Sequence, residues 1–197
     1  MTTRDAVNIL ASTLPEGVSL VSSPGRTADE VANKFPNQTL FIDSMGDVVP
    51  IAMGLALGLS PLPVVALDTD GSHLFGLSVL ATLGAHWKKL SNLTVIVFDD
   101  HLYEGAGALP SRLCSIDWSM LGRAFELPIS AIGNPDQFQS VLAKHNMSGT
   151  YCIVGVNNPT PVGSCSRTID GIESRYNFVR HIERITGHTI LQPCIKG

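Results

Sequence analysis

The chain has 197 residues, of which 44% are hydrophobic and 15% are charged, and its formal net charge is −4. This length and apolar content allow one substantial core and about one domain. The net negative charge provides no electrostatic attraction to nucleic acid or to an anionic membrane, so we expect neither as a partner.

Helical and strand patterns alternate along the chain, which predicts an α/β fold with a doubly wound, mostly parallel sheet flanked by helices. The expected helices cover residues 6–14, 27–34, 47–59, 73–90, 118–125 and 135–145. The expected strands cover residues 18–21, 40–42, 63–67, 93–98, 130–132 and 151–156. Thr27 and Ser72 are expected to be the N-caps of the second and fourth of these helices.

A C-terminal segment follows a stretch rich in Asn, Pro, Gly and Ser at residues 157–167, which predicts a loop or linker. Beyond it, apolar residues recur at helical spacing in an otherwise charged segment. These residues are Ile172, Tyr176, Val179 and Ile182. We expect a helix that either folds back onto its own domain or binds a partner.

Membrane and export signals are not expected in this sequence. The longest apolar stretch, residues 48–59, contains two glycines and is too short to span a bilayer. The N-terminus lacks the cationic start and long apolar core of a signal peptide. The cysteines show no CxxC spacing, so we expect reduced thiols with packing roles in a cytoplasmic protein. They are Cys114, Cys152, Cys165 and Cys194.

Two acidic turns follow neighbouring apolar runs. Asp70 begins an Asp-Gly-Ser turn after the run at 63–67, and Asp99 and Asp100 follow the run at 93–98. One crossover helix fits between the runs, so two parallel strands would bring these carboxylates to one edge of a sheet. Oxygen ligands without nearby Cys or paired His favour Mg²⁺ or Ca²⁺ over Zn²⁺.

The same turn is suited to a phosphate group. Gly71 lets a phosphate approach the backbone closely, and the N-terminus of the following helix offers free N–H groups. The pattern therefore predicts a site for Mg²⁺ and a diphosphate. The alternative is that the four aspartates of the two turns, Asp68, Asp70, Asp99 and Asp100, only cap helices and turns.

At these residues the chain resembles the thiamine diphosphate (ThDP) enzymes, whose pattern is Gly-Asp-Gly-Ser followed by Asn-Asn at the end of the next strand. More narrowly, it looks like the small subunit of the sulfopyruvate decarboxylase type and the related phosphonopyruvate decarboxylases. The resemblance extends from about residue 3 to residue 162. The segments that carry it are 43–46, 50–58, 70–72, 93–100 and 103–107.

The resemblance implies a role for particular residues. Mg²⁺ would be bound by Asp70, Asp100 and the carbonyl of Leu102. The cofactor would be held by Asp43, Ser44, Met45, Gly71, Ser72, Tyr103 and Gly105. In that set Gly71 and Ser72 hold the diphosphate, Met45 separates the two rings, and the Asp43 carbonyl accepts a hydrogen bond from the aminopyrimidine. The alternative for Met45 is an ordinary core position.

Candidate catalytic residues are His101, Glu104 and His73. His101 lies between the two proposed metal ligands Asp100 and Leu102, where it is a possible proton donor. His73 follows the phosphate turn and either contacts substrate or belongs only to the first turn of the helix. Glu104 either borders the cofactor or is an exposed loop charge.

Two departures from the family pattern bear on cofactor binding. Thr69 replaces the first glycine, and Asp99-Asp100 replaces Asn-Asn. The extra negative charge at Asp100 beside a diphosphate costs electrostatic energy unless a cation offsets it, so we expect binding to depend strongly on Mg²⁺. The alternative is a noncatalytic scaffold or regulatory subunit with a decayed cofactor site.

The chain is too short to hold the second domain that grips the pyrimidine in this family and supplies an activating glutamate. The resemblance therefore implies an obligate pyrimidine-binding, alpha-type partner subunit in a hetero-oligomer. The expected domains are a ThDP-binding domain at 1–162 and a C-terminal extension at 163–197. The implied activity is decarboxylation of a 2-oxo acid; a carboligase of a specialised biosynthetic pathway is the alternative.

The acid group of such a substrate needs cationic contacts if it carries a sulfonate or a phosphonate. Few basic residues lie near the motif: Lys88 and Lys89 fall at the far end of the crossover helix, and Arg112 follows the loop. The partner is expected to supply the missing charge. A dinucleotide-binding alternative is disfavoured because no G-x-G-x-x-G follows the first strand.

Overall fold

The computed structural model describes residues 1–111, 116–144, 149–158 and 170–191. Its helices are α1 (Thr3–Thr13), α2 (Arg26–Ala32), α3 (Val48–Leu59), α4 (Asp70–Phe75), α5 (Val79–His86), α6 (Trp118–Ala124), α7 (Pro135–Lys144) and α8 (Gly171–Thr186), with 3₁₀ turns η1 (Trp87–Lys89) and η2 (Glu104–Ala106). Its strands are β1 (Ser19–Ser22), β2 (Thr39–Phe41), β3 (Val64–Thr69), β4 (Leu93–Asp99), β5 (Leu102–Tyr103), β6 (Leu109–Pro110), β7 (Ile129–Ile132) and β8 (Thr150–Gly155).

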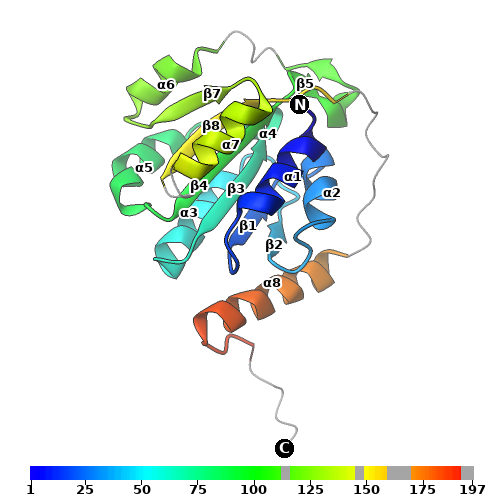
Figure 1. The fold of residues 1–197 in the computed structure, drawn as a ribbon, viewed down its shortest axis with the longest axis vertical. Coiled ribbons are helices and arrows are strands. Elements are labelled where there is room, and N and C mark those ends of the chain that lie inside the picture. The colour runs from blue at the N-terminus through cyan, green and yellow to red at the C-terminus, as the bar shows by residue number, and fades with distance from the viewer. Residues whose placement is uncertain (112–115, 145–148, 159–169, 192–197) are drawn as a thin grey trace, which may run out of the picture.

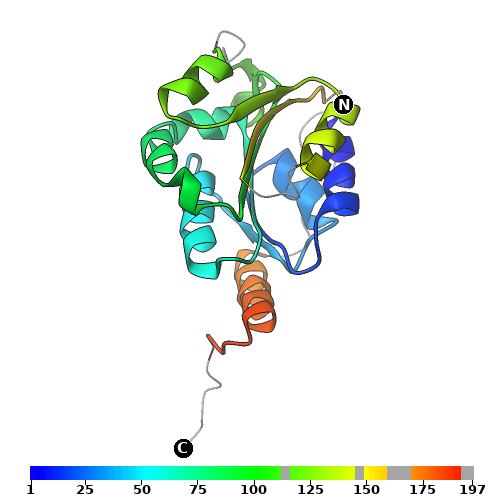
Figure 2. The same cartoon turned by 60° about the vertical axis from the view of Figure 1, so that its left-hand side comes forward.

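Six of the strands form one parallel sheet in the order β2-β1-β3-β4-β8-β7, and β5 and β6 form a small antiparallel hairpin (Figure 1). Helices cover both faces of the sheet: α1, α2 and α7 lie on one side and α3 and α5 on the other (Figure 2). The expected doubly wound α/β fold is confirmed.

The central strands are buried on both faces, as expected for a parallel sheet covered by helices. Every residue of β4 is buried, and its two faces belong to two different hydrophobic clusters. Val95 and Val97 pack with α3 and α5, whereas Ile96 and Phe98 pack with α1 and α7. The alternation follows from the two-residue period of a strand. β4 is therefore covered on both sides up to Asp99 at its carboxyl end.

The register of β3 and β4 brings the two acidic turns together. The pairing runs from Val64 opposite Leu93 to Thr69 opposite Phe98. Asp70 and Asp99 therefore follow directly at the same carboxyl edge of the sheet, which confirms the expected placement. β1 is the other neighbour of β3, so the segment after Ser22 also reaches this edge.

The connection between β3 and β4 differs from the single helix expected at 73–90. It consists of α4, α5 and η1, with Gly76 ending α4. Both expected caps are wrong. Ser72 lies inside α4, whose N-cap is Thr69, and Thr27 is buried inside α2, whose N-cap is Gly25 with φ of +79°. Glycine suits that cap because a positive φ is strained for other residues.

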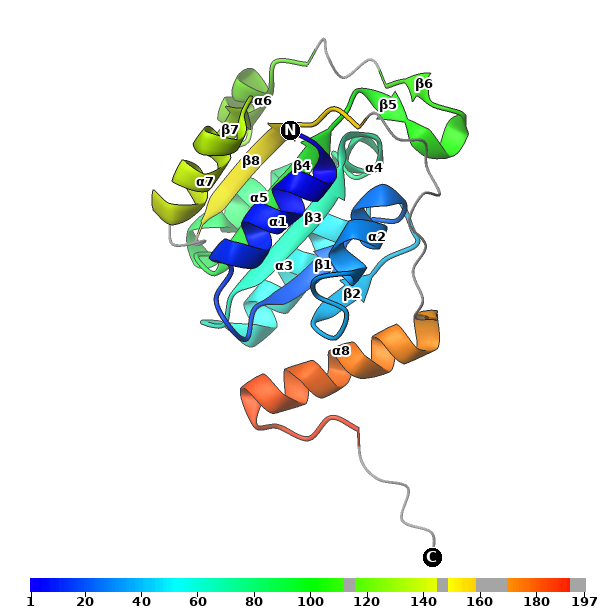
Figure 3. The same cartoon turned by 45° about the vertical axis from the view of Figure 1, so that its right-hand side comes forward.

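The C-terminal helix α8 lies beside the edge strand β2, on the side of the sheet away from β5 and β6 (Figure 3). Its inner face holds Phe178, His181 and Ile182, and the His181 ring lies 3.3 Å from the Ser19 hydroxyl. The helix thus packs on its own domain. The expected stripe was partly wrong, because Ile172 and Tyr176 are exposed.

Within the described residues no helix is both long and apolar enough to cross a membrane. Cys152 is a free, buried thiol, and burial raises its pKa to about 12, which agrees with the expected packing role. Cys114, Cys165, Cys194 and Arg112 lie outside the described residues, as does most of the expected loop at 157–167.

Candidate active site

A cavity of about 560 Å³ opens at the carboxyl edge of the sheet. Its volume is in the range of pockets that hold small-molecule ligands and cofactors. The lining comes from α1, the start of α2, the loop before α3, the β3–α4 turn, the segment after β4 and the end of β8. The lining residues used below are Thr3, Gly25, Arg26, Met45, Thr69, Asp70, Gly71, Ser72, Phe75, Asp100, Leu102, Tyr103, Glu104 and Asn158.

Asp70 is the residue of the cavity whose polar group is least satisfied. Its side chain is buried, and its Oδ2 atom has no hydrogen-bond partner in the part of the chain that the structure describes. Burial raises the pKa of Asp70 to about 7, and the nearby Asp99 and Asp100 add to the rise. A buried carboxylate in this position is costly without a compensating cation. Asp70 therefore fits a divalent metal ligand.

Two sets of candidate metal ligands lie around Asp70. Ligand atoms of Asp70, Asp99 and His101 lie within 4.8 Å of one another, and the His101 ring is 2.8 Å from the Asp99 carboxylate. Asp100 and Leu102 lie with Asp70 in the cavity lining, and the Leu102 amide donates to Asp100 Oδ1 at 3.1 Å. Burial also raises the pKa of Asp100. Apart from the His101 ring nitrogen, the candidate ligand atoms are carboxylate or carbonyl oxygens, which suits Mg²⁺.

Gly71 and Tyr103 form one wall of the cavity. A Cβ atom at Gly71 would lie 2.8 Å from the Tyr103 ring and 3.9 Å from the tip of Met45. Only glycine therefore leaves the backbone of this turn accessible between the two side chains. Such a backbone is a surface that a phosphate can approach, as expected from the sequence.

The loop that carries Met45 is attached to α4. The Gly46 amide donates to the Ser72 hydroxyl at 3.1 Å. A Cβ at Gly76 would lie 2.4 Å from the Gly46 carbonyl, so the two backbones are in direct contact there. Met45 is 44% exposed and borders the cavity, so the alternative of an ordinary core position is wrong.

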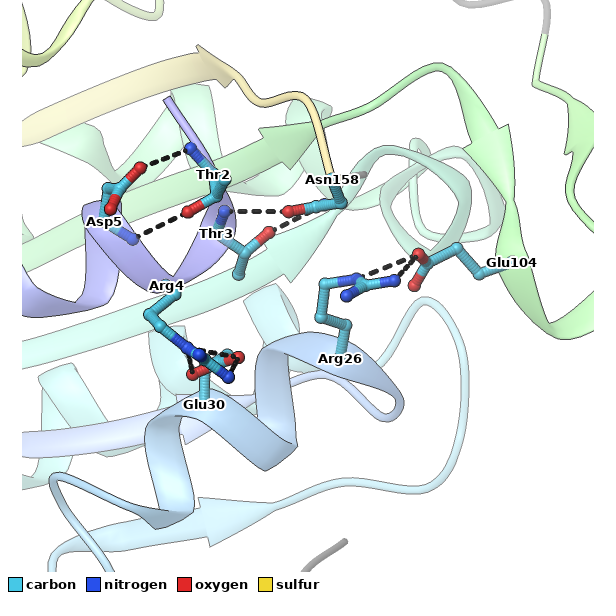
Figure 4. A network of polar contacts seen from close by, with 8 residues as sticks. All are labelled: Thr2, Thr3, Arg4, Asp5, Arg26, Glu30, Glu104 and Asn158. Carbon is cyan, nitrogen blue, oxygen red and sulfur yellow. Dashed lines mark hydrogen bonds and ion pairs between the residues drawn. The ribbon is translucent and has the colours of Figure 1, made fainter. Parts of the chain in front are cut away.

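Arg26 reaches the cavity from the first residue of α2. Its Nε and Nη2 atoms donate to Glu104 Oε1 at 2.9 and 2.7 Å (Figure 4). Both side chains are largely buried, with 12% and 20% exposed. Glu104 is thus not a free loop charge. Among the described lining residues Arg26 is the one basic side chain.

Asn158 connects the end of β8 to the N-terminus of α1. Its side-chain carbonyl accepts from the Thr3 amide and its NH₂ group donates to the Thr3 hydroxyl, at 2.9 and 3.0 Å (Figure 4). The NH₂ group also lies 3.4 Å from Asp100 Oδ2. Asn158 therefore orients one carboxylate of the cavity.

Sequence reasoning missed Arg26 and Asn158. The signal for Arg26 was present, because a strand at 18–21 that pairs with the strand at 63–67 brings the following residues to the same edge. Asn158 follows shortly after β8, which ends at Gly155, in a segment that the sequence marks only as a loop.

Most of the predicted site residues meet in the cavity. Those that line it are Met45, Asp70, Gly71, Ser72, Asp100, Leu102, Tyr103 and Glu104. Asp43, Ser44 and His101 are not among its lining residues in the described chain. Gly105 lies in η2 between Glu104 and Ala106, which both line the cavity.

His73 is buried behind the cavity wall. Its Nδ1 atom lies 3.2 Å from Asp68 Oδ2, and its Nε2 atom lies 2.5 Å from the Tyr151 hydroxyl. With both ring nitrogens bonded and the ring 1% exposed, the structure does not bring His73 to a substrate. Direct contact with substrate is therefore not supported.

Thr69 stands where the family has its first glycine. Its backbone is extended, with φ of −114° and ψ of 156°, a conformation that any residue adopts. The replacement therefore places no strain on the turn.

Comparison with known proteins agrees with this geometry. The model of the C-terminal TPP (thiamine pyrophosphate, ThDP) binding domain of thiamine pyrophosphate enzymes matches residues 27–154. The chain is 29% identical over 141 residues to phosphonopyruvate decarboxylase of Streptomyces hygroscopicus, covering 70% of this chain and 34% of that protein. The homologous protein of Streptomyces viridochromogenes is 32% identical over 114 residues, covering 57% and 28%.

Sulfopyruvate decarboxylase subunit beta of Methanococcus maripaludis is 26% identical over 144 residues, covering 73% of this chain and 76% of that subunit. The chain thus spans about a third of the phosphonopyruvate decarboxylases that it matches.

Solved structures show the same fold. The thiamine diphosphate-dependent 4-hydroxybenzoylformate decarboxylase of Rhodococcus jostii has a TM-score of 0.66 at 16% identity, covering 80% of this chain and 32% of that one. Benzoylformate decarboxylase of Polynucleobacter necessarius has a TM-score of 0.63 at 18% identity, covering 80% and 34%. The matched domain, the cavity and the fold lead to one conclusion: this chain belongs to the thiamine pyrophosphate enzymes and carries their C-terminal TPP-binding domain.

Proposed function

We propose that the chain is the diphosphate-binding subunit of a two-subunit, ThDP-dependent 2-oxo acid decarboxylase of the sulfopyruvate or phosphonopyruvate type. The observation that carries the proposal is the buried Asp70 carboxylate, which has an oxygen without a partner among the described residues and lies beside the accessible backbone of Gly71. A metal-bound diphosphate satisfies both features at once.

In this proposal Mg²⁺ is held by Asp70, Asp100 and the Leu102 carbonyl, and the diphosphate by Gly71 and Ser72. Asn158 keeps Asp100 oriented. When bound, ThDP supplies the electron sink that allows a 2-oxo acid to release CO₂. The chain itself would position the cofactor.

The remaining predicted cofactor contacts and catalytic groups have different support. Met45 and Tyr103 border the cavity and are proposed to contact the cofactor rings. The Asp43 carbonyl, Ser44 and Gly105 keep the roles implied by the family. His101 remains a candidate proton donor at the cavity rim, with its ring side chain 55% exposed.

Arg26 is the proposed contact for the acid group of the substrate. It is the one basic residue among the described cavity-lining residues, whereas the sequence had suggested only Lys88, Lys89 and Arg112. Arginine is suited to this role because its planar fork binds carboxylate, sulfonate and phosphonate oxygens in pairs. Glu104 holds the guanidinium in place before substrate binds.

A partner subunit is proposed to supply the pyrimidine-binding surface and the activating glutamate. The relative of similar length is named a beta subunit, whereas the longer relatives extend far beyond the matched region. Large apolar side chains are exposed at and near the cavity, among them Met45, Phe75 and Leu109. A partner subunit that covers these side chains would complete a heteromeric enzyme. We propose that this enzyme is cytoplasmic and biosynthetic.

The test is titration calorimetry with ThDP and Mg²⁺ on the chain alone and on the chain co-expressed with a candidate pyrimidine-binding, alpha-type subunit. We expect Mg²⁺-dependent binding, and CO₂ release from sulfopyruvate or phosphonopyruvate only by the complex. Decarboxylation at an enzymatic rate by the chain alone would disprove the partner. CO₂ release accompanied by an acyloin product, formed with an added aldehyde or a second 2-oxo acid, in place of the free aldehyde would favour the carboligase.

The noncatalytic scaffold is the second candidate, because Asp100 adds negative charge where the family has an amide. It predicts no heat from ThDP and Mg²⁺ in either preparation. The extended backbone of Thr69 argues against it, since the turn needs no glycine at that position.

The metal ligands are distinguished by two variants. Asp100→Ala is expected to weaken Mg²⁺-dependent ThDP binding more than tenfold, since it removes a proposed ligand. Asp99→Asn is expected to change binding by less than about threefold, because Asp99 does not line the cavity. The opposite ranking would assign the metal to Asp70, Asp99 and His101 instead.

A further inference from the structure

We propose that Asp68, His73 and Tyr151 form a hydrogen-bonded clamp that fixes the turn at residues 69–72. In consequence these three side chains are positioning residues for the metal and the diphosphate, a part of the inference that rests on the proposed function. They belong to three different elements: Asp68 to β3, His73 to α4 and Tyr151 to β8.

The clamp closes around the turn through one carboxylate. Asp68 Oδ1 accepts from the Thr69 amide at 3.0 Å, and Asp68 Oδ2 lies 3.2 Å from His73 Nδ1. Thr69 begins the turn and His73 immediately follows it. The two oxygens therefore hold both ends of the segment that carries Asp70 and Gly71.

Tyr151 fixes the orientation of the imidazole. Its hydroxyl lies 2.5 Å from His73 Nε2. Burial raises the pKa of Tyr151 above its usual range, so the hydroxyl stays protonated. It donates a hydrogen bond to His73 Nε2. The Nδ1 atom then carries the imidazole proton and donates to Asp68. Each bond of the clamp thus has a donor and an acceptor.

The surroundings hold the clamp in one arrangement. The Asp68, His73 and Tyr151 side chains are each about 1% exposed. The Trp118 ring lies 6.0 Å from the His73 ring in a tilted packing, and Trp87 packs on Tyr151. Hydrogen bonds in such a dry setting are strong, and a partner removed from one of them is costly.

None of the three side chains lines the cavity among the described residues, so none is placed to touch cofactor or substrate. Their effect has to pass through the backbone of the turn. A hydrophobic core alone does not require an Asp-His-Tyr chain at this place, because apolar residues of similar size would fill the same volume without polar atoms to satisfy. This favours a role in fixing the turn.

The test compares Tyr151→Phe and Asp68→Asn with the native chain in two measurements. Hydrogen exchange of the amides of residues 69–72, on the cofactor-free chain, reports the turn directly. Calorimetry with Mg²⁺ and ThDP reports the consequence. We expect exchange at the turn to be about tenfold faster and ThDP affinity about tenfold weaker in Tyr151→Phe. Asp68→Asn keeps one acceptor oxygen and is expected to show a similar change.

Trp118→Phe is the matched control. It loosens packing on the same imidazole but removes no hydrogen bond of the clamp. We expect a lower melting temperature with unchanged exchange at the turn and unchanged ThDP affinity. A double variant, Tyr151→Phe with His73→Leu, is expected to lose no more affinity than the larger single effect, since the three groups act as one unit.

The outcomes separate the clamp from the proposed function. If the native chain and its complex fail to bind Mg²⁺–ThDP, the proposed function fails, and exchange at the turn still decides the clamp. If Tyr151→Phe and Asp68→Asn leave exchange at residues 69–72 no faster than in Trp118→Phe, the clamp is disproved. Faster exchange with unchanged ThDP affinity would disprove the positioning role.

Discussion

The buried Asp70 carboxylate destabilises the metal-free chain, and a bound cation would remove that cost. Burial raises its pKa to about 7, from an ordinary value near 3.8. Between these pH values the folded chain holds a proton that the unfolded chain has released, so the free energy of unfolding falls as the pH rises through this window. A bound divalent ion removes the penalty, because it stabilises the carboxylate.

We predict that Asp70→Asn stabilises the metal-free chain at pH 8 by about 1 to 3 kcal/mol and flattens the pH dependence of unfolding between pH 4 and 7. The same variant is expected to lose Mg²⁺-dependent ThDP binding. Denaturant unfolding in EDTA, followed by tryptophan fluorescence, measures the first effect. Asp136→Asn, at an exposed position of α7, is the control. A less stable Asp70→Asn chain at pH 8 would contradict the prediction.

Arg26 and Glu104 connect α2 to the turn that borders the cavity. A double-mutant cycle with Arg26→Ala and Glu104→Ala is predicted to give a coupling free energy of about 1 to 2 kcal/mol in unfolding, because the pair is largely shielded from water. Arg4 and Glu30 form a pair of similar geometry, but the Arg4 side chain is 62% exposed.

The Arg4–Glu30 cycle is the control, and its coupling is expected to be below about 1 kcal/mol. Equal couplings in the two cycles would show that shielding of the Arg26 pair has no energetic effect.

Arg26→Lys keeps the charge but not the planar fork of the guanidinium. We therefore expect the KM for the 2-oxo acid to rise more than kcat falls in the complex.

At the scale of elements, the packing of α8 against the sheet includes a buried histidine, His181. Burial lowers the pKa of His181, and the nearby Arg184 lowers it further. Below the ordinary pKa near 6.5 the unfolded chain therefore takes up a proton that the folded chain resists, and stability is lost as the pH falls. The contribution is complete at neutral pH.

We predict that stability of the native chain relative to His181→Gln falls by about 1 kcal/mol between pH 7.5 and pH 5, with hydrogen exchange in α8 rising in parallel. His188→Gln, at an exposed position after the helix, is the control and should follow the native chain. A parallel pH dependence of native and His181→Gln stability would rule out this role.

The elements also show how far sequence reasoning reached. Parallel strands covered on both faces give continuous apolar runs, so β3 and β4 were predicted within two residues, and with them the meeting of Asp70 and Asp99. The interruption between α4 and α5 was missed, because it depends on contact of Gly76 with Gly46, far away in sequence. Arg26 was missed for a different reason: its place at the cavity follows from the pairing of β1 with β3, and the expected strands had not been put in spatial order.

At the scale of the whole molecule, the cavity lies beside exposed apolar side chains. Phe75 lines it and is 69% exposed, and Met45 is 44% exposed. Phe75→Ser is predicted to weaken assembly with the proposed pyrimidine-binding partner at least tenfold, while the melting temperature of the chain alone changes little. Size-exclusion chromatography of the co-expressed pair measures assembly.

Ile172→Ser is the matched control, since Ile172 is 82% exposed on α8, which lies away from β5 and β6 (Figure 3) and contributes no described residue to the cavity lining. It is expected to leave assembly unchanged. Equal loss of assembly in both variants, or in neither, would place the partner elsewhere.

The direct contact of Gly46 with Gly76 has a consequence for how this protein can change. Even a methyl group at either position would separate the two loops and displace Met45 from its place at the cavity. Natural variation can therefore retune the pocket through the side chains on its rim, but a substitution at this crossing requires both loops to be rebuilt together.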